Sequence, residues 1–194
     1  MFETPDPIAR FAKIYEQVKK IVTPEPTAMI LATVSAAGKP SARVVLLKDF
    51  DERGFVFYTN LESRKGQELR ANPYAALCFY WGALEQQVRL EGRIEKVADV
   101  EADAYFASRP RGSQISAWAS KQSRTLTSRE ELESRVQAVE KKFVGRDLPR
   151  PPFWSGFRVI PERMEFWQSR PNRLHDRTVY WRENNRWKIE KLYP

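Results

Sequence analysis

The first pattern along the chain is a helical one. Apolar side chains recur at intervals of three or four residues from Ile8 to Val22, with charged and polar residues between them. Such spacing places the apolar side chains on one face of an amphipathic helix. We predict a helix over this stretch, ended by Pro24 and Pro26. Together, residues 1–26 are expected to form an N-terminal helix and linker.

A different pattern runs from there to the C-terminus. Short runs rich in Val, Phe, Tyr and Thr alternate with clusters of Gly, Asp and Pro, which favours β-strands joined by turns. Tight turns are predicted at residues 36–39 and 49–54. The predicted strands cover residues 28–34, 42–48, 55–59, 75–81, 87–97, 156–159, 163–168, 178–181 and 187–189.

Three further helices interrupt these strands. Ser63 and Asp99 are candidate N-caps, because short polar side chains accept hydrogen bonds from the free N–H groups of a first helical turn. The segment Thr127-Ser128-Arg129-Glu130 has the spacing of a capping box, which opens the third helix. The predicted helices cover residues 63–71, 99–106 and 127–143.

Many antiparallel strands with few, peripheral helices predict an α+β protein whose sheet closes into a barrel. The chain has 194 residues, the size of one domain. It contains no internal repeat and no low-complexity tract that would mark a boundary. We therefore predict a single domain over residues 1–194.

Composition narrows the setting of this domain. Hydrophobic residues make up 42% of the chain and aromatic residues 12%, which suits a packed core. No apolar run approaches the roughly 20 residues of a membrane span, and no basic and apolar leader opens the chain. Cys78 is the only cysteine, which fits a reducing compartment. We expect a cytoplasmic protein without a membrane partner, and Cys78 as a small buried apolar residue.

Several kinds of catalytic site are excluded by absent motifs. The chain has no glycine-rich dinucleotide fingerprint, no P-loop and no nucleophile elbow, and it lacks the pairs of cysteines or histidines that hold zinc. His175 is the only histidine, and nothing marks a partner serine for it. We expect no metal site and no hydrolase triad.

The net charge of +8 favours anionic partners, and the basic residues lie in short clusters. Arg43 and Lys48 flank an apolar strand, while Arg64 and Lys65 follow the predicted N-cap Ser63, where free N–H groups also suit a phosphate. Tyr105-Phe106-Ala107-Ser108-Arg109-Pro110-Arg111-Gly112-Ser113 offers a second anion site. Arg170, Arg173, Asp176 and Arg177 crowd around His175, the one side chain that ordinarily titrates near neutral pH. Each cluster alone is equally compatible with a solvated surface.

Taken in order, the clusters resemble the pyridoxamine/pyridoxine 5′-phosphate oxidase family over residues 27–194. No single motif is specific, but seven occur in sequence at plausible spacing. They are Arg43 to Lys48; Tyr58-Thr59 with Ser63-Arg64-Lys65; Leu84-Glu85-Gln86-Gln87-Val88; Ser108-Arg109-Pro110-Arg111 with Ser113-Gln114; Ala117-Trp118 with Ser120-Lys121-Gln122-Ser123; Glu165-Phe166-Trp167-Gln168; and Arg173-Leu174-His175-Asp176-Arg177.

The resemblance implies an FMN-binding split β-barrel that works as a homodimer, with FMN at the subunit interface. It implies oxidation of pyridoxamine or pyridoxine 5′-phosphate at C4′, with O2 as the final acceptor, H2O2 released and pyridoxal 5′-phosphate as the product. Because the flavin carries the redox chemistry, the chain needs no nucleophile of its own. This explains the missing catalytic motifs.

The resemblance also implies the residues of the site. Arg173 and His175 would lie over the substrate ring as the catalytic pair, and we expect Arg173 to matter more. The residues implied for FMN are Arg43, Val44, Val45, Leu46, Leu47, Lys48, Tyr58, Thr59, Arg64, Lys65, Gln87, Gln122, Ser123, Trp167 and Arg177. The residues implied for the substrate are Lys48, Tyr105, Arg109, Ser113, Arg173 and His175.

Other functions remain open at this point. A related flavin oxidase of the same fold would act on another substrate, such as a phenazine precursor, although the cluster at Arg109 to Ser113 favours a substrate phosphate. A nucleic-acid-binding protein would explain the positive charge, but acidic residues are interleaved with the basic ones throughout, whereas such proteins carry a continuous basic stripe. A flavin- or phosphate-binding module without turnover is the third alternative.

Overall fold

The computed structural model describes residues 4–184 and 186–194, and its main feature is one antiparallel sheet of nine strands. The strand order is β2-β1-β5-β6-β7-β4-β3, and β8 and β9 extend the sheet from β7. The strands are β1 Ala28–Val34, β2 Pro40–Leu46, β3 Asp49–Asp51, β4 Gly54–Asn60, β5 Tyr74–Trp81, β6 Gln86–Lys96, β7 Trp154–Gln168, β8 Asp176–Glu183 and β9 Arg186–Lys191.

The sheet curls because its two end strands, β2 and β3, are neighbours in the chain, joined only by Leu47 and Lys48. Five α-helices and two short 3-10 helices accompany the sheet in the described residues, and the prediction of a mainly antiparallel α+β protein agrees with this arrangement. The helices are α1 Pro7–Ile21, α2 Arg64–Ala71, α3 Asp99–Ser108, α4 Arg111–Ala119, α5 Arg129–Lys142, η1 Gly82–Leu84 and η2 Pro171–Arg173.

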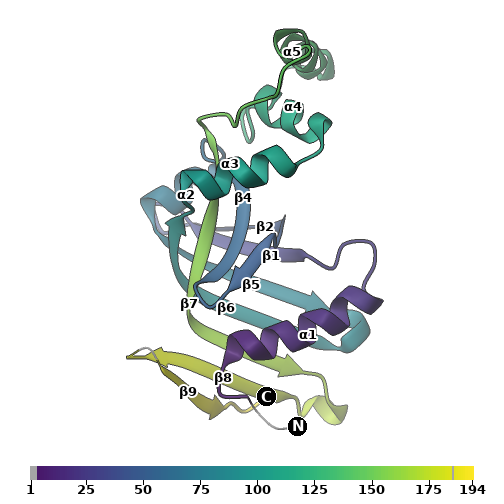
Figure 1. Cartoon of the computed structure of the whole chain (residues 1–194). Helices are drawn as coiled ribbons and strands as arrows, with labels where there is room; N and C mark the ends of the chain where they lie inside the picture. The colour runs from purple at the N-terminus through teal and green to yellow at the C-terminus, as the bar shows by residue number, and fades with distance from the viewer. Residues whose placement is uncertain (1–3, 185) are drawn as a thin grey trace.

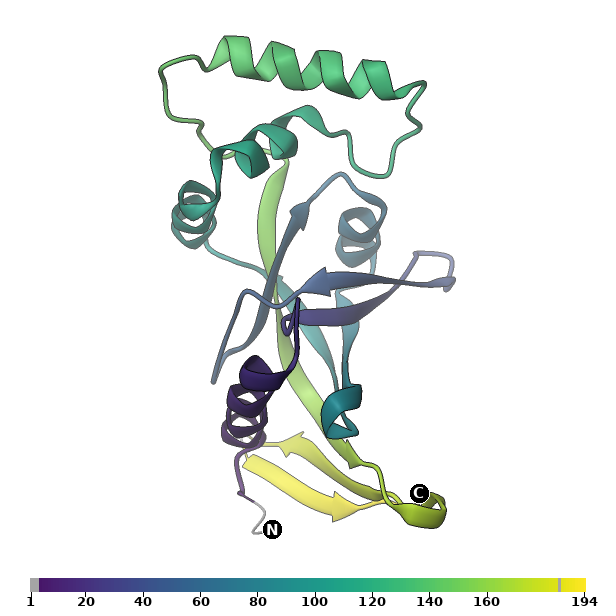
Figure 2. The same cartoon turned by 90° about the vertical axis from the view of Figure 1, so that its right-hand side faces the viewer.

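The helices gather at two ends of the molecule (Figures 1 and 2). Helices α3, α4 and α5 lie beyond one end of the sheet, while α1, β8 and β9 lie at the other. Phe11 of α1 packs into the main core, and its ring centre lies 4.9 Å from the ring centres of Phe50 and Phe55. A second core under α3 to α5 contains Phe106 and Trp154. The molecule therefore presents two separate ends on which sites can be built.

Strand β7 corrects the sequence prediction most clearly. Two strands were expected on either side of Pro161, but a single strand of 15 residues runs through it. A bulge in β6 between Glu91 and Gly92 brings Gly92 opposite Pro161, and a bulge is where a strand tolerates a proline. A Cβ on Gly92 would lie 1.9 Å from the carbonyl oxygen of Ile160, so this close approach requires glycine.

Smaller corrections concern helix ends and turns. Ser128, not Thr127, caps α5 and accepts from the N–H of Glu131, so the capping box is shifted by one residue. Asp99 is the first residue of α3 and not its cap, because Ala98 holds that place without a side-chain bond. Part of the expected turn at 49–54 forms β3.

Helix α4 was not predicted at all, because Pro110, Gly112 and Ser113 indicated a loop. Cys78 is half-buried, and burial raises the pKa of its thiol. Among the described residues, no helix has both the length and the apolar character needed to cross a membrane. The single domain over residues 1–194 stays a prediction.

Candidate active site

The predicted site residues fall into two groups at opposite ends of the molecule. The first group surrounds a cleft of about 650 Å³ between the sheet and helices α3 and α4, which we call the α3–α4 cleft. Strands β2 and β4, helix α2 and the first residue of β7 complete its walls. The predicted residues that line it are Arg43, Val44, Val45, Leu46, Lys48, Tyr58, Thr59, Lys65, Tyr105, Arg109, Ser113 and Gln122.

Beside this cleft, a buried carboxylate holds two of the predicted arginines. Glu68 of α2, with a side chain 6% exposed, lies 3.2 Å from Arg43 Nη2 and 2.9 Å from Arg64 Nε. Thr33 and Ser41 also donate hydrogen bonds to its Oε2 atom. Burial alone would raise the pKa of Glu68, but the hydrogen bonds from Ser41, Thr33 and Arg64 outweigh it and lower the pKa to about 2.

Lys65 is held differently from these arginines. Its Nζ atom donates to Gln122 Oε1 at 2.8 Å and to Thr59 Oγ1 at 3.3 Å. All three residues were predicted for FMN, and the structure brings them together from α2, β4 and the segment after α4. Burial lowers the pKa of Lys65, and the nearby charge of Arg43 lowers it further. A cation with neutral partners keeps its attraction for a phosphate.

Arg109 lies across the cleft and also lacks a carboxylate partner among the described residues. Its guanidinium carbon is 4.9 Å from the ring centre of Trp154, and its Nη1 atom is buried without a hydrogen bond. Burial lowers its pKa. Buried donors in native proteins are nearly always paired, so this atom indicates a place for an acceptor from outside the chain.

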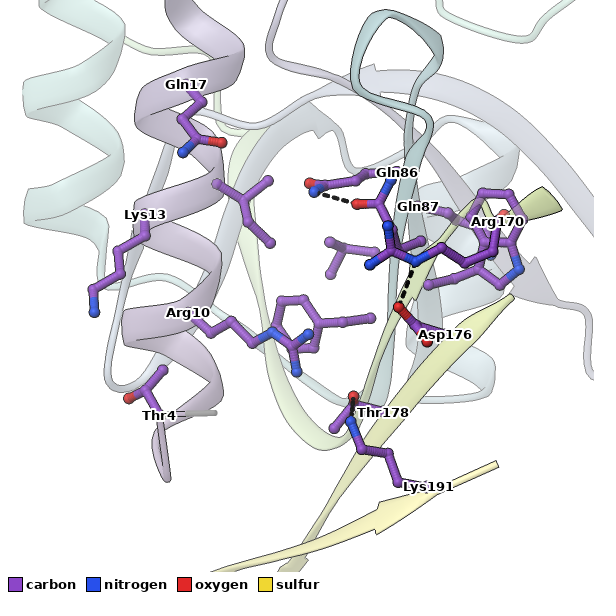
Figure 3. Close-up of a pocket in the computed structure, with 15 residues that line it drawn as sticks. Thr4, Arg10, Lys13, Gln17, Gln86, Gln87, Arg170, Asp176, Thr178 and Lys191 are labelled. Atoms are coloured by element: carbon purple, nitrogen blue, oxygen red, sulfur yellow. Dashed lines mark hydrogen bonds and ion pairs between the residues drawn. The ribbon is translucent and has the colours of Figure 1, made fainter. Parts of the chain in front are cut away.

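The second group of predicted residues lies near a pocket of about 440 Å³ between α1 and the sheet, which we call the α1 pocket (Figure 3). Gln87 and Trp167 line it together with Arg10 and Lys13 of α1, and Figure 3 shows Arg10 and Gln87 on different sides of the pocket. The ring of His175 packs on Trp167, with the ring centres 4.6 Å apart. This places His175 beside the pocket.

The loop that carries Arg173 and His175 is tightly constrained. The N–H of Arg170 donates to His175 Nδ1 at 3.2 Å, and its side chain pairs with Asp176 at 2.7 Å. The neutral imidazole therefore carries its proton on Nε2. Asn172 and Arg173 both have positive φ, 56° and 61°, which costs energy for residues other than glycine and is found most often at functional sites.

Arg177 is the last member of this second group. Its Nε and Nη2 atoms lie 2.9 Å from Glu165 Oε1, so a buried carboxylate holds it as Glu68 holds Arg43. Arg89 and Arg163 each lie 2.6 Å from the other oxygen of Glu165. Burial would raise the pKa of Glu165, but the hydrogen bonds from these three arginines lower it.

Comparisons with known proteins agree on one family. Residues 14–143 match the family model described as pyridoxamine 5′-phosphate oxidase, and residues 154–194 match the pyridoxine 5′-phosphate oxidase C-terminal dimerisation region. The chain belongs to the pyridoxine/pyridoxamine 5′-phosphate oxidase family. An oxidase of this name from Myxococcus xanthus is 64% identical over 98% of this chain and 92% of its own length. One from Gloeothece citriformis is 59% identical over 98% of this chain and 89% of its own length.

Solved structures place the fold in the same family. PhzG from Burkholderia lata 383, in complex with tetrahydrophenazine-1-carboxylic acid, matches with a TM-score of 0.93 and 34% identity, over 98% of this chain and 94% of that one. A pyridoxamine 5′-phosphate oxidase-related, FMN binding protein from Nostoc punctiforme matches with a TM-score of 0.78 and 18% identity, over all of both chains. The predicted FMN-binding split barrel is confirmed, as is the prediction of an FMN-dependent oxidoreductase.

The α3–α4 cleft fits the phosphate groups that this oxidase family handles. Lys65 and Lys48 have no ion pair among the residues that the structure describes, and Arg109 offers a buried, unpaired donor. A phosphate ester supplies the missing negative charge and acceptor oxygens. Within the same described ranges, no three His, Cys, Asp or Glu side chains come together as a metal site would need.

Some predicted residues of the oxidase site lie outside both lining sets. The side chain of Leu47 is in the main core, Arg64 is 63% exposed and paired with Glu68, and Ser123 follows Gln122 with a φ of 70°. Arg173, His175 and Arg177 line neither space themselves, although Arg170 and Asp176 of the same segment line the α1 pocket. Sequence reasoning did not identify Asn60, Glu68, Trp154 or Glu165 as members of the site. Of these four residues, only Glu68 had a local signal in the sequence: it lies four residues after Arg64, which is the spacing of an ion pair along a helix.

Proposed function

We propose that this chain oxidises pyridoxamine 5′-phosphate or pyridoxine 5′-phosphate at C4′ to pyridoxal 5′-phosphate. FMN, when bound, would supply the hydride acceptor and pass two electrons to O2, which takes up two protons and leaves as H2O2. With pyridoxine 5′-phosphate the remaining proton leaves the hydroxyl group. With pyridoxamine 5′-phosphate the oxidised product is an imine, which adds water and releases ammonia to give the same aldehyde. The observation that carries the proposal is the α3–α4 cleft of about 650 Å³, which is lined by Lys48, Lys65 and Arg109, three cations without a carboxylate partner among the described residues.

The residues of the cleft divide between the two phosphates. Lys65, Thr59 and Gln122 form one polar group, which we assign to the FMN phosphate. Arg109 and Ser113 lie on the opposite wall, and we assign them to the substrate phosphate. Separate anchoring of the two ligands lets the chain hold C4′ against the flavin ring, which is the main task that the protein has in a flavin reaction.

A second copy of the chain is needed to complete this site. Trp154 lines the α3–α4 cleft and Trp167 lines the α1 pocket, at opposite ends of the 15-residue strand β7. At about 3.3 Å per residue, they lie roughly 40 Å apart along the strand path. One FMN cannot contact both groups in the same chain, which supports a homodimer with FMN at the interface.

The outer face of the sheet suits that interface. Val44 of β2, Ile30 of β1 and Cys78 of β5 lie side by side across three strands. Val44 is 65% exposed and Tyr80, further along β5, is 64% exposed. Exposed apolar rows of this kind mark interaction surfaces. Because Val44 also lines the α3–α4 cleft, a partner on this face would reach the cleft.

Complementation between two variants tests the shared site. Arg109→Gln damages the α3–α4 cleft, and Arg173→Ala damages the loop at the other end. If each site takes its parts from both chains, mixing and refolding the two variants together should give, at a substrate concentration well below the raised KM of Arg109→Gln, more turnover than either variant alone. Mixed dimers that stay as inactive as the separate variants would contradict the proposal.

Arg173 and His175 are proposed to act on the substrate ring. Because Nδ1 of His175 already accepts from Arg170, the neutral ring offers Nε2–H to the substrate as a hydrogen-bond donor. We therefore expect Arg173→Ala to reduce kcat more than His175→Ala does. Steady-state kinetics of both variants measure this, and a larger loss at His175 would reverse the ranking.

The decisive experiment on the function uses the purified protein. The expected results are a yellow protein with a flavin spectrum, and release of H2O2 and pyridoxal 5′-phosphate when pyridoxine 5′-phosphate and air are supplied. A folded protein that stays colourless with added FMN would refute the proposal. The half-buried single thiol fits a reducing compartment, and we propose the cytoplasm as its location.

The similarity to PhzG at 34% identity supports one alternative, oxidation of a phenazine precursor. This alternative predicts turnover of an unphosphorylated tricyclic acid and none of pyridoxine 5′-phosphate. The unpaired Arg109 favours a phosphorylated substrate instead. Supplying each substrate in turn distinguishes the two.

A further inference from the structure

Trp154 belongs to a group of stacked aromatic rings and was not predicted as a site residue. Its ring lies parallel to that of Tyr58, with centres 5.2 Å apart and an interplanar angle of 7°. Tyr58 in turn stacks on Tyr105 at 4.0 Å and 14°. Residues from β7, β4 and α3 thus form one stack along the wall of the α3–α4 cleft.

The backbone and ring of Trp154 are held from several sides. It pairs with Asn60 in the ladder between β7 and β4, and Arg150 Nη1 donates to its carbonyl at 2.8 Å. Arg150 also binds Asp103 of α3 at 2.6 Å. The edge of the Trp154 ring meets Phe106 at 5.2 Å. With only 6% of its surface exposed, the residue forms a fixed platform.

Arg109 lies on this platform. Its guanidinium is 4.9 Å from the centre of the Trp154 ring and 5.7 Å from that of Phe106. An aromatic face attracts a cation without neutralising it and without occupying its N–H donors. A carboxylate would do both, as Glu68 does for Arg43. The stack therefore fixes the position of Arg109 while leaving Nη1 buried and available.

We propose that Trp154 is a positioning residue that holds Arg109 ready for the phosphate ester of the substrate. Its ring sets how strongly the site prefers phosphorylated over unphosphorylated ligands. This inference rests on the proposed function and adds to it a residue outside the predicted site. Trp154 acts through Arg109 and Tyr105, and its own contacts with the reacting atoms are not required.

The test compares Trp154→Leu with Trp154→Phe. Leucine removes the aromatic face, whereas phenylalanine keeps one that is smaller. In Trp154→Leu we expect the KM for pyridoxine 5′-phosphate to rise about 10-fold, while kcat changes less than about 2-fold and FMN stays bound. Trp154→Phe should recover most of the affinity. A fall in kcat with an unchanged KM would overturn the inference.

A double-mutant cycle separates positioning from general damage. In an Arg109→Gln background, Trp154→Leu should raise KM no further, because the group it positions is already gone. If the two substitutions raise KM by factors that multiply in the double variant, the two residues act independently and the inference is overturned. Trp118→Leu is the matched control, because Trp118 lies against the same second core but does not line the cleft; we expect its KM to match that of the wild type.

Binding of inorganic phosphate to the FMN-loaded dimer, measured by calorimetry, keeps this test independent of turnover. Phosphate binding should weaken in Trp154→Leu and not in Trp118→Leu. If the wild type binds phosphate through Arg109 but does not oxidise pyridoxine 5′-phosphate, the proposed function fails and the positioning role stands. If oxidation proceeds and Trp154→Leu binds phosphate as the wild type does, only the positioning role fails. Should Trp154→Leu not fold, the same comparisons with Trp154→Phe decide, with a smaller expected change in the same direction.

Discussion

Glu68 and Trp154 each hold arginine side chains beside the same cleft, but by different physical means. Glu68 is a buried carboxylate that binds Arg43 and Arg64 and accepts from Thr33 and Ser41. Trp154 offers Arg109 only an aromatic face. In the first region charge is compensated within the chain, and in the second it is left to be compensated by a ligand.

The difference separates the cations beside an anion site into two kinds, according to the group that holds each cation. A guanidinium that a buried carboxylate holds contributes mainly to the structure, because removal of either partner leaves an uncompensated charge. A guanidinium on an aromatic face keeps its charge and donors for binding. By this criterion Arg43 fixes β2 against α2, whereas Arg109 is available to bind substrate.

The largest effect is expected when the carboxylate of the first region is removed. Glu68→Gln leaves Arg43, whose side chain is only 20% exposed, without its counter-charge, and breaking a buried pair costs about 3–5 kcal/mol. We expect the free energy of unfolding in urea to fall by about that amount at pH 7. Glu133→Gln, which removes an exposed carboxylate paired with Arg129, should change it by less than about 0.5 kcal/mol. Equally small losses of unfolding free energy in both variants would show that Glu68 does not stabilise this region.

Acid should weaken the same region. The pKa of Glu68 is lowered from 4.5 to about 2 in the folded protein, so its contribution is complete above pH 4.5 and is lost as the pH falls through about 2. The shift corresponds to roughly 3 kcal/mol. Urea unfolding at pH 7 and at pH 2.5 should show the difference between wild type and Glu68→Gln shrinking in acid. A difference of the same size at both values would contradict the lowered pKa.

The opposite kind of result is expected in the second region. Arg109→Gln removes the charged donor that we propose for the substrate phosphate, and we expect the KM for pyridoxine 5′-phosphate to rise about 100-fold, equivalent to about 2.7 kcal/mol. Stability should hardly change, since no carboxylate loses its partner. The control is Arg129→Gln on exposed α5. A large loss of stability with little change in KM would place Arg109 with the arginines of the first region and break the comparison.

The basic residues of both regions could be predicted from the sequence, but the residues that hold them could not. The clusters at Arg43 to Lys48, at Arg64-Lys65 and at Arg109 to Ser113 were all visible as basic residues next to predicted elements, and the structure brings members of each, though not Arg64, to one cleft. Whether the charge of a basic residue is compensated by a carboxylate depends on residues far away in the chain. Glu68 meets Thr33 and Ser41 only because β1, β2 and α2 pack together.

The fold shows the same limit. Local patterns predicted most strands and the first helix, because runs of β-forming residues bounded by turn residues and apolar residues at helical spacing are both local signals. Strand β7 was divided at Pro161, since the bulge that accommodates the proline belongs to another strand, at Gly92. Trp154 was not among the predicted site residues, and it is buried. Its role depends on which cation lies over its ring, and spacing along the chain does not encode that.

The smallest expected effect refines the first region itself. Arg64 binds Glu68 as Arg43 does, but its side chain is 63% exposed and the pair spans i,i+4 on α2. Exposed pairs of this type contribute about 0.3–0.5 kcal/mol, and Glu68 keeps Arg43, Thr33 and Ser41 if Arg64 is lost. We expect Arg64→Gln to lower the free energy of unfolding by no more than about 0.5 kcal/mol in the protein without FMN.

The effect on FMN separates two roles for Arg64. If its exposed guanidinium reaches the FMN phosphate, as the family resemblance implies, Arg64→Gln should weaken FMN binding several-fold in a fluorescence titration while unfolding in the absence of FMN barely changes. Gln67→Ala, on the same helix but outside the cleft lining, is the control. Unchanged FMN affinity would leave Arg64 as a partner of Glu68 alone, and a loss of stability as large as that in Glu68→Gln would mean that exposure does not distinguish the two arginines of this region.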